Sequence, residues 1–126
     1  MQRLINWFEI PVSDLARAKT FYEETFQVVL RIENMGDVQL AVFPYAEPAT
    51  GGALLACPEG RPGEHGVVIY LDGGADLAQP LARAVAAGGR VLMPKTEISP
   101  EIGHIALFAD SEGNRIGLHS PGRVAG

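Results

Sequence analysis

The sequence predicts an α+β protein built from two βαβββ units in one chain, and three observations lead to this fold class. Residues 6–26 join a short apolar strand to an amphipathic helix, which is how a crossover unit begins. The same strand–helix pattern returns at residues 67–87, and three strand-like segments follow each helix. We therefore expect one domain over residues 1–126, with a first unit at about 4–58 and a second at about 66–120.

The first unit opens with an apolar strand at residues 7–12. Apolar side chains then recur at helical spacing over residues 15–26, and Ser13 or Asp14 can cap that helix by accepting a hydrogen bond from its first turn. Strands are expected at 28–32, 38–43 and 52–57. A turn at 35–37 and a loop rich in Pro, Ala and Gly at 44–51 separate them.

The second unit repeats this order with a strand at 67–71, a turn at 72–74 and a helix at 76–87. Asp76 is the expected cap of this helix, and Gly88 or Gly89 can supply the left-handed residue that ends it. Strands are expected at 90–93, 104–109 and 115–119. The segment 94–103 is expected as a loop, and 110–114 has the composition of a turn.

This arrangement predicts a cleft, because a sheet with its helix on one face must cover its other face as well. Two such sheets, from one chain or from two, can curl around each other and leave a pocket between them. Side chains that alternate along the strands then decide which residues enter the pocket.

Composition and charge exclude several classes of function. The net charge of −5 and the scattered Lys and Arg residues argue against nucleic-acid and acidic-membrane partners. No apolar run approaches the ~20 residues that a membrane-spanning helix needs. The single cysteine, Cys57, excludes an internal disulfide and fits a reducing, cytoplasmic location; it is expected as buried filler, with a nucleophile as the alternative.

Three stretches make the sequence similar to a known family: IPVSDLARAKTFYEETF, AAGGRV and DSEGNRIGLHS. With them the chain resembles the vicinal-oxygen-chelate superfamily of glyoxalases, bleomycin-resistance proteins and extradiol dioxygenases, over Trp7 to Ser120. The resemblance implies two curled sheets. It also implies a homodimer in which sheets of two subunits complete the cleft.

Members of this family hold a divalent metal with four His, Glu or Gln side chains, one from each of four strands. Matching the motifs residue by residue puts Trp7, Leu55, Gly66 and Gly117 at those four positions. None of these side chains can donate to a hard cation. We therefore expect the usual metal site to be lost and no cofactor to be needed. A divalent metal would require relocated ligands, such as Glu9, His119 and one further histidine.

Glu9 and His119 are the candidate catalytic or ligand-orienting groups. Each lies two residues from an empty ligand position and so shares its strand face. A carboxylate and an imidazole in a cleft suit general acid–base work. The alternative is that Glu9 pairs with a nearby arginine and that His119 sits at an exposed strand end.

The remaining candidates are contacts of a ligand rather than chemical groups. Trp7 can form a flat apolar floor, although Trp7 and Tyr70 are both also candidates for the core. His104 can touch a ligand beside the loop 94–103, or can be a solvated loop-end histidine. His65, in the connector between the units, is expected to be structural, although it lies next to Gly66.

Two functions follow. The first is a binding module that sequesters a small apolar or aromatic metabolite, as the bleomycin-resistance branch does. The second is a glyoxalase I-like lyase or a dioxygenase-like enzyme, which would use relocated metal ligands or a metal-free acid–base pair. Both involve a small molecule and a second copy of the chain, and neither involves nucleic acid or a membrane.

Overall fold

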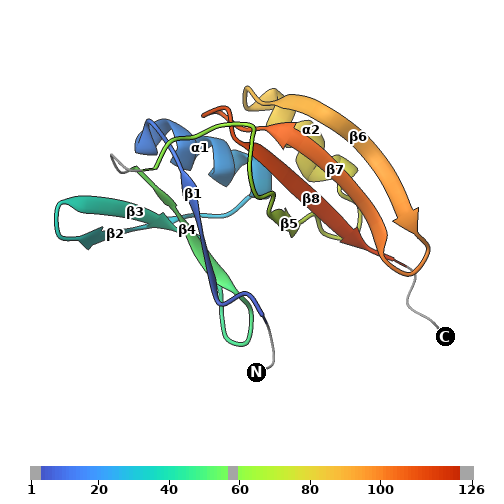
Figure 1. Ribbon diagram of the computed structural model, residues 1–126, viewed down its shortest axis with the longest axis horizontal. Coiled ribbons are helices and arrows are strands. Elements are labelled where there is room, and N and C mark those ends of the chain that lie inside the picture. The colour runs from blue at the N-terminus through green and yellow to red at the C-terminus, as the bar shows by residue number, and fades with distance from the viewer. Residues whose placement is uncertain (1–3, 57–59, 123–126) are drawn as a thin grey trace.

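The computed structural model describes residues 4–56 and 60–122, so Cys57 lies outside the described residues (Figure 1). The chain contains two helices and two sheets, and each half follows the order strand, helix and three strands, so the predicted pair of βαβββ units is confirmed. The first unit comprises β1 (Trp7–Pro11), α1 (Leu15–Phe26), β2 (Arg31–Met35), β3 (Val38–Val42) and β4 (Gly51–Leu55). The second comprises β5 (Tyr70–Asp72), α2 (Ala78–Ala86), β6 (Arg90–Ser99), β7 (Gly103–Ala109) and β8 (Arg115–Pro121).

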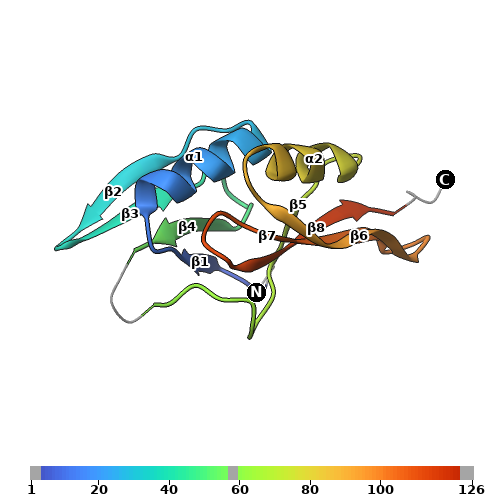
Figure 2. The same cartoon turned by 90° about the horizontal axis from the view of Figure 1, so that it is seen from above.

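Each unit forms its own four-stranded mixed sheet, with the order β1-β4-β3-β2 in the first and β5-β8-β7-β6 in the second. In both sheets the first strand of the unit pairs in parallel with the last, and the other pairs are antiparallel. The two helices pack together in one layer, and both sheets lie in the layer beneath them (Figure 2). The helix layer thus covers one face of each sheet, and we call the opposite face the uncovered face.

Two strands begin later than the sequence predicts. Residues 28–30 were expected in a strand but form an irregular segment that is bonded back to α1. The Val28 N–H donates to the Glu23 carbonyl, and the Leu30 N–H donates to the Glu23 carboxylate at 2.8 Å. In the second unit, Gly66 has a φ of 105° and Val67 is 93% exposed, so the expected strand at 67–71 starts only at Tyr70.

The segment 94–103 was expected as a loop, and this prediction is wrong except at residues 100–102, which form the turn between β6 and β7. β6 continues through Pro94 to Ser99, with irregular register against β7. β6 is an edge strand, where a proline can be accommodated because one side of the strand has no partner that needs its missing N–H. The local composition of 94–99 resembles a loop, but pairing with β7 makes it a strand.

The predicted N-cap of α1 and the predicted end of α2 are confirmed, but the predicted N-cap of α2 is wrong, because Leu77 occupies that position and makes no side-chain capping hydrogen bond. Asp14 caps α1 by accepting a hydrogen bond from the Arg17 N–H at 3.0 Å, as expected. Gly88 follows α2 with a φ of 106°, the left-handed conformation predicted there. α2 itself starts at Ala78, two residues later than expected. Asp76 still acts on its first turn, since its carboxylate accepts the Ala78 N–H at 3.0 Å.

The turn between β7 and β8 fastens the second unit to the start of α1. The Glu112 carboxylate accepts the backbone N–H groups of Ser13 and Asp14 at 2.8 and 2.9 Å and the Arg17 side chain at 2.7 Å. Two neighbouring side chains join it: Asn114 donates to the Pro11 carbonyl, and Asp110 accepts the Tyr22 hydroxyl at 2.6 Å. We call Asp110, Glu112 and Asn114 the α1 clasp.

The clasp has strong electrostatic character. Burial raises the pKa of Glu112, but hydrogen bonds from Arg17, Asp14, Ser111 and Ser13 outweigh this and lower the pKa to about 2. Burial, with the nearby Asp110 carboxylate, raises the pKa of Tyr22 well above its usual value, so its hydroxyl remains a hydrogen-bond donor. The partial positive charge at the N-terminus of α1 also favours a carboxylate there.

Candidate functional site

Alternation along β1 places Trp7 and Glu9 on the uncovered face of the first sheet. Phe8 and Ile10 point the other way, toward the helices, and Ile10 is only 2% exposed. Trp7 is 42% exposed, and its indole N–H donates to the Glu9 carboxylate at 3.3 Å. The hydrogen-bond partner that the structure gives to Glu9 is therefore the neighbouring indole rather than an arginine.

Tyr45 extends this aromatic surface. Its ring meets the Trp7 ring edge-on, with centroids 6.1 Å apart and planes at 72°. It also lies against Gly51, the residue of β4 that pairs with Trp7, so a Cβ at position 51 would collide with the tyrosine ring. Sequence reasoning missed Tyr45 because it follows the end of β3 and reaches the sheet only through the folded loop.

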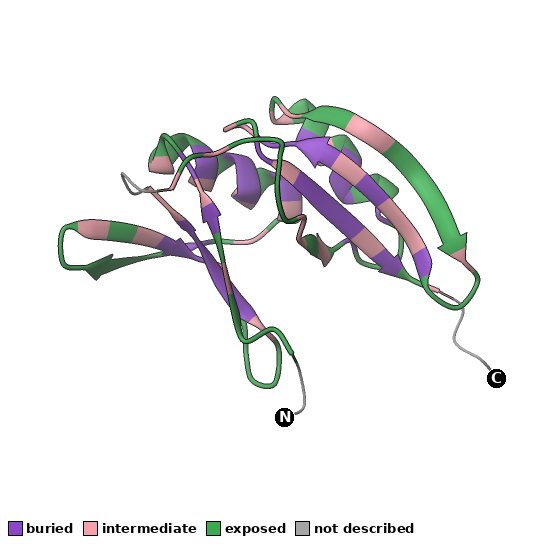
Figure 3. Cartoon of the chain, viewed as in Figure 1, coloured by how far each residue is buried: buried purple, intermediate pink, exposed green. Residues whose placement is uncertain are grey.

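The second sheet also has a tyrosine ring packed over a glycine. Tyr70 of β5 pairs with Gly117 of β8, and its ring fills the space that a Cβ at Gly117 would need. Tyr70 is 44% exposed, so its alternative assignment to the core is wrong. On the same face, the His119 imidazole lies 2.7 Å from the carbonyl of Ile102. Figure 3 shows that the strands of both sheets combine buried residues with partly and fully exposed ones.

The four positions matched to metal ligands do not form a metal site. Leu55 pairs with Pro11, four residues along β1 from Trp7, which corresponds to about 13 Å. Gly66 lies in the connector before β5, and Gly117 lies beneath Tyr70. None of these residues offers a donor atom, so the residues present do not fit a divalent ion. Over residues 4–56 and 60–122, no group of three or more His, Cys, Asp or Glu side chains could hold one.

The candidate polar residues are distributed over separate places. Glu9 lines a pocket of about 210 Å³ together with His65 and Arg115, whereas His119 lies in the other sheet, opposite Asp72 of β5. His104 pairs with the buried Ser120 and so lies on the helix-facing side of β7, with its Nε2 3.9 Å from the Glu97 carboxylate. Within one chain, then, His104 does not share a face with His119.

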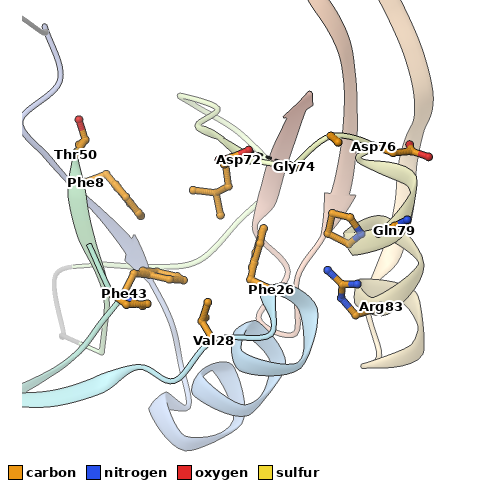
Figure 4. A pocket seen from close by; sticks show the side chains of 15 residues that line it. Phe8, Phe26, Val28, Phe43, Thr50, Asp72, Gly74, Asp76, Gln79 and Arg83 are labelled. Carbon is orange, nitrogen blue, oxygen red and sulfur yellow. Dashed lines mark hydrogen bonds between the residues drawn. The ribbon is translucent and has the colours of Figure 1, made fainter. Parts of the chain in front are cut away.

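A larger cavity than the one beside Glu9 lies between the two units, at the C-terminal end of α1 (Figure 4). It has a volume of about 540 Å³, and we call it the inter-unit pocket. Its apolar walls come from both units. Its polar side chains are those of Thr50 before β4, Asp72 of β5, Asp76 after β5, and Gln79 and Arg83 of α2. Sequence reasoning missed it because Phe8 and Phe26 have the spacing of core residues, and only the packing of the units leaves space beside them. The lining residues used below are Phe8, Phe26, Val28, Phe43, Gln79 and Arg83.

Comparison with known proteins places this geometry in context. A family model described as the Glyoxalase/Bleomycin resistance protein/Dioxygenase superfamily matches residues 4–118. The structure is similar to TnmS3, an antibiotic-binding protein from Streptomyces sp. CB03234, with 30% sequence identity, a TM-score of 0.68 and coverage of 94% of this chain and 96% of that one.

Two further structures show the same fold. A glyoxalase/bleomycin resistance protein from the same Streptomyces strain is 28% identical, with a TM-score of 0.68 and coverage of 93% of this chain and all of that one. A glyoxalase I mutant from Zea mays is 22% identical, with a TM-score of 0.67 and coverage of 91% of this chain and 45% of that one; it shares the fold alone. No curated protein matches the chain.

Proposed function

The chain belongs to the Glyoxalase/Bleomycin resistance protein/Dioxygenase superfamily, and we propose that within it the protein binds a small apolar or planar aromatic molecule without converting it. The observation that carries this proposal is the aromatic surface at the positions matched to metal ligands. An indole stands at one of them, and a tyrosine ring lies over the glycine at another. Such surfaces attract flat apolar molecules, and they cannot act as a Lewis acid.

The similarity to TnmS3 supports the same function. That protein binds an antibiotic, and the two chains align over nearly their full lengths at 30% identity. Fold alone does not determine function, because glyoxalases share this architecture. The side chains on the sheets distinguish the two functions, and here they suit binding.

We further propose that two copies of the chain form the complete site. Each uncovered face carries large exposed side chains, including Trp7 and Tyr45 on the first sheet and Tyr70 and Ile98 on the second. Apolar surface of this kind is typical of a protein or ligand interface. In a two-fold dimer, the first sheet of one copy can face the second sheet of the other, so that both sites are equivalent.

In this arrangement Glu9 and His119 would act together although one chain keeps them on different sheets. Glu9 accepts the Trp7 N–H, which ties the indole to the next side chain on the same face of β1. His119 is anchored by the Ile102 carbonyl. We propose that these two groups orient polar substituents of the ligand, and that the aromatic rings supply most of the contact area.

Trp7 provides the test, because it is the single tryptophan of the sequence. A panel of antibiotics with planar aromatic parts, including bleomycin with its bithiazole, would be titrated against the protein while the fluorescence of Trp7 is followed. We expect saturable quenching, loss of binding in Trp7→Ala measured by equilibrium dialysis, and recovery of the ligand unchanged by mass spectrometry. Binding that is the same in wild type and Trp7→Ala would contradict the proposed site.

The enzymatic alternative is tested with the same preparation. Protein purified without chelators would be assayed with methylglyoxal–thiol adducts and with catechols, with zinc, nickel, iron or manganese added in turn. We expect no turnover above that of Glu9→Gln. Turnover that requires both a metal and Glu9 would show that relocated ligands restore the chemistry of the family.

A further inference from the structure

We infer that the inter-unit pocket is a second ligand site, separate from the uncovered sheet faces, and that it takes an amphipathic molecule with a planar apolar body and one anionic group. The pocket lies on the helix side of the sheets, because Phe8 points away from the face that carries Trp7. Its volume of about 540 Å³ is in the range of sites that hold small organic molecules.

The apolar half of the pocket is formed by rings that the core holds in place. Phe8 and Phe43 pack with ring centroids 5.7 Å apart. Phe43 meets the buried Tyr22 edge-on at 5.6 Å, and Phe26 stacks on the other side of Tyr22 at 6.2 Å. Because the ring of Tyr22 is fully buried and contacts both Phe26 and Phe43, these rings cannot easily collapse into the cavity. Figure 4 shows Phe8, Phe43, Val28 and Phe26 around the same space.

Arg83 supplies the charge. Its Nε donates to the Thr25 carbonyl at the end of α1 at 2.8 Å, which fixes the plane of the half-buried guanidinium. Within the described part of the chain, no acidic side chain forms an ion pair with its terminal nitrogens. Gln79 lies one turn earlier on the same face of α2 and adds an amide. A guanidinium held in this way suits a carboxylate or sulfonate, which it can bind through two parallel hydrogen bonds.

Two acidic side chains, Asp72 and Asp76, also line the pocket. Asp76 pairs with Lys95 at 2.9 Å, and the Asp72 carboxylate accepts the Gly74 N–H at 2.8 Å. Asp72 keeps its negative charge, because a hydrogen bond from a backbone N–H does not neutralise a carboxylate. The expected preference for an anion over a neutral molecule of the same shape therefore depends on direct contact with the guanidinium of Arg83. Arg83 and the aromatic rings line the same cavity, so one molecule that carries both an anionic group and an apolar body can contact them together.

The experiment compares two fluorescent probes of similar shape. 1-Anilinonaphthalene-8-sulfonate carries the anion, and N-phenyl-1-naphthylamine lacks it. We expect wild type to bind the sulfonate more tightly, and Arg83→Gln to weaken the sulfonate about tenfold while changing the neutral probe less than about twofold. Val28→Trp, which fills the cavity, should abolish the binding of both probes that Trp7→Ala leaves in place. Arg31→Gln removes an exposed arginine of β2 and serves as the matched control, with no change expected.

Two results would overturn the inference. If Trp7→Ala weakens the sulfonate and Arg83→Gln does not, the probe binds at the uncovered faces and the pocket is not a site. If Val28→Trp converts a dimer to a monomer in sedimentation, a second copy of the chain occupies the pocket instead. Circular dichroism of both variants checks that they fold. Arg83→Lys, which keeps the charge without the planar fork, should restore part of the preference for the sulfonate.

Discussion

The two ends of α1 join the same two units in opposite ways. At its N-terminus, the α1 clasp closes the junction with charge-assisted hydrogen bonds, and the side chain of Glu112 is 0% exposed. At its C-terminus, Phe26 and the following Val28 leave the inter-unit pocket open. The difference indicates a division of roles. One end fixes how the units sit relative to each other, and the other end can then keep an unfilled cavity without losing the fold.

The division has an energetic basis. Hydrogen bonds to a charged group are stronger than neutral ones, and Glu112 accepts several of them. The open end is stabilised instead by ring packing around Tyr22, which contacts both Phe26 and Phe43. Tyr22 links the two ends, since its hydroxyl reaches the clasp. Variants at the N-terminal end of α1 should therefore change mainly the stability of the protein, and variants at its C-terminal end should change mainly the binding of a ligand in the inter-unit pocket.

The largest effect on stability is expected for Glu112→Gln. The neutral amide keeps the shape but loses the charge that faces Arg17 and the first N–H groups of α1, and we expect a loss of about 3 kcal/mol in the free energy of unfolding. Urea denaturation measures it. Glu24→Gln, on the exposed side of the same helix, is the control and should change stability by less than about 0.5 kcal/mol.

Acid should act on the same end of the helix. The pKa of Glu112 is lowered from 4.5 to about 2 in the folded protein, so its contribution is fully present above the unfolded pKa and is lost as the pH falls from 4.5 toward 2. We expect the free energy of unfolding of wild type to drop across this window. Glu112→Gln should show a smaller drop in the free energy of unfolding. An identical pH profile for the two proteins would contradict the claim that the ionised Glu112 stabilises the fold.

Tyr22→Phe should have an intermediate effect, because it removes one bond of the clasp and keeps the ring. The buried Asp110 carboxylate loses the donor at 2.6 Å but retains hydrogen bonds from Glu112 and Asn114. We expect a loss of about 2 kcal/mol by urea denaturation. Probe binding in the inter-unit pocket should be unchanged, since the ring that supports Phe26 and Phe43 remains in place.

Val28→Trp should have the smallest effect on stability and the largest on binding. The pocket has room for the indole, so we expect the free energy of unfolding to change by less than about 1 kcal/mol while probe binding is lost. Thermal unfolding and fluorescence titration measure the two properties. A stability loss comparable to that of Glu112→Gln would mean that the open end, too, is a tightly packed part of the junction.

Much of the fold could be predicted from the sequence because its signals are local. The helical spacing of residues 15–26 and the cap at Asp14 locate α1, and the glycine after residue 87 locates the end of α2. The errors arise where pairing or tertiary contacts override composition. β6 extends past Pro94 because β7 pairs with it, and residues 28–30 are held by Glu23, seven residues from Leu30.

The candidate site was predictable in part for the same reason. Period-two alternation placed Trp7 and Glu9 on one face, and the structure has them there. Tyr45 over Gly51 depends on the register between β1 and β4 and on a loop, neither of which the sequence specifies locally. The inter-unit pocket depends on how two separate cores meet. The roles of Glu9 and His119, the absence of a cofactor and the cytoplasmic location stay predictions. In the described residues no helix is long and apolar enough to cross a membrane.

The most direct test of the central proposal mixes two defective variants. Trp7→Ala damages the first sheet and Tyr70→Ala damages the second, so each variant alone should bind the antibiotic weakly. If the first sheet of one copy and the second sheet of another form the site, dimers that contain both variants have one intact site, and mixing should restore about a quarter of the wild-type sites. Equilibrium dialysis with the tightest-binding antibiotic of the panel counts them. No restoration, in a mixture shown by native mass spectrometry to contain mixed dimers, would contradict the account.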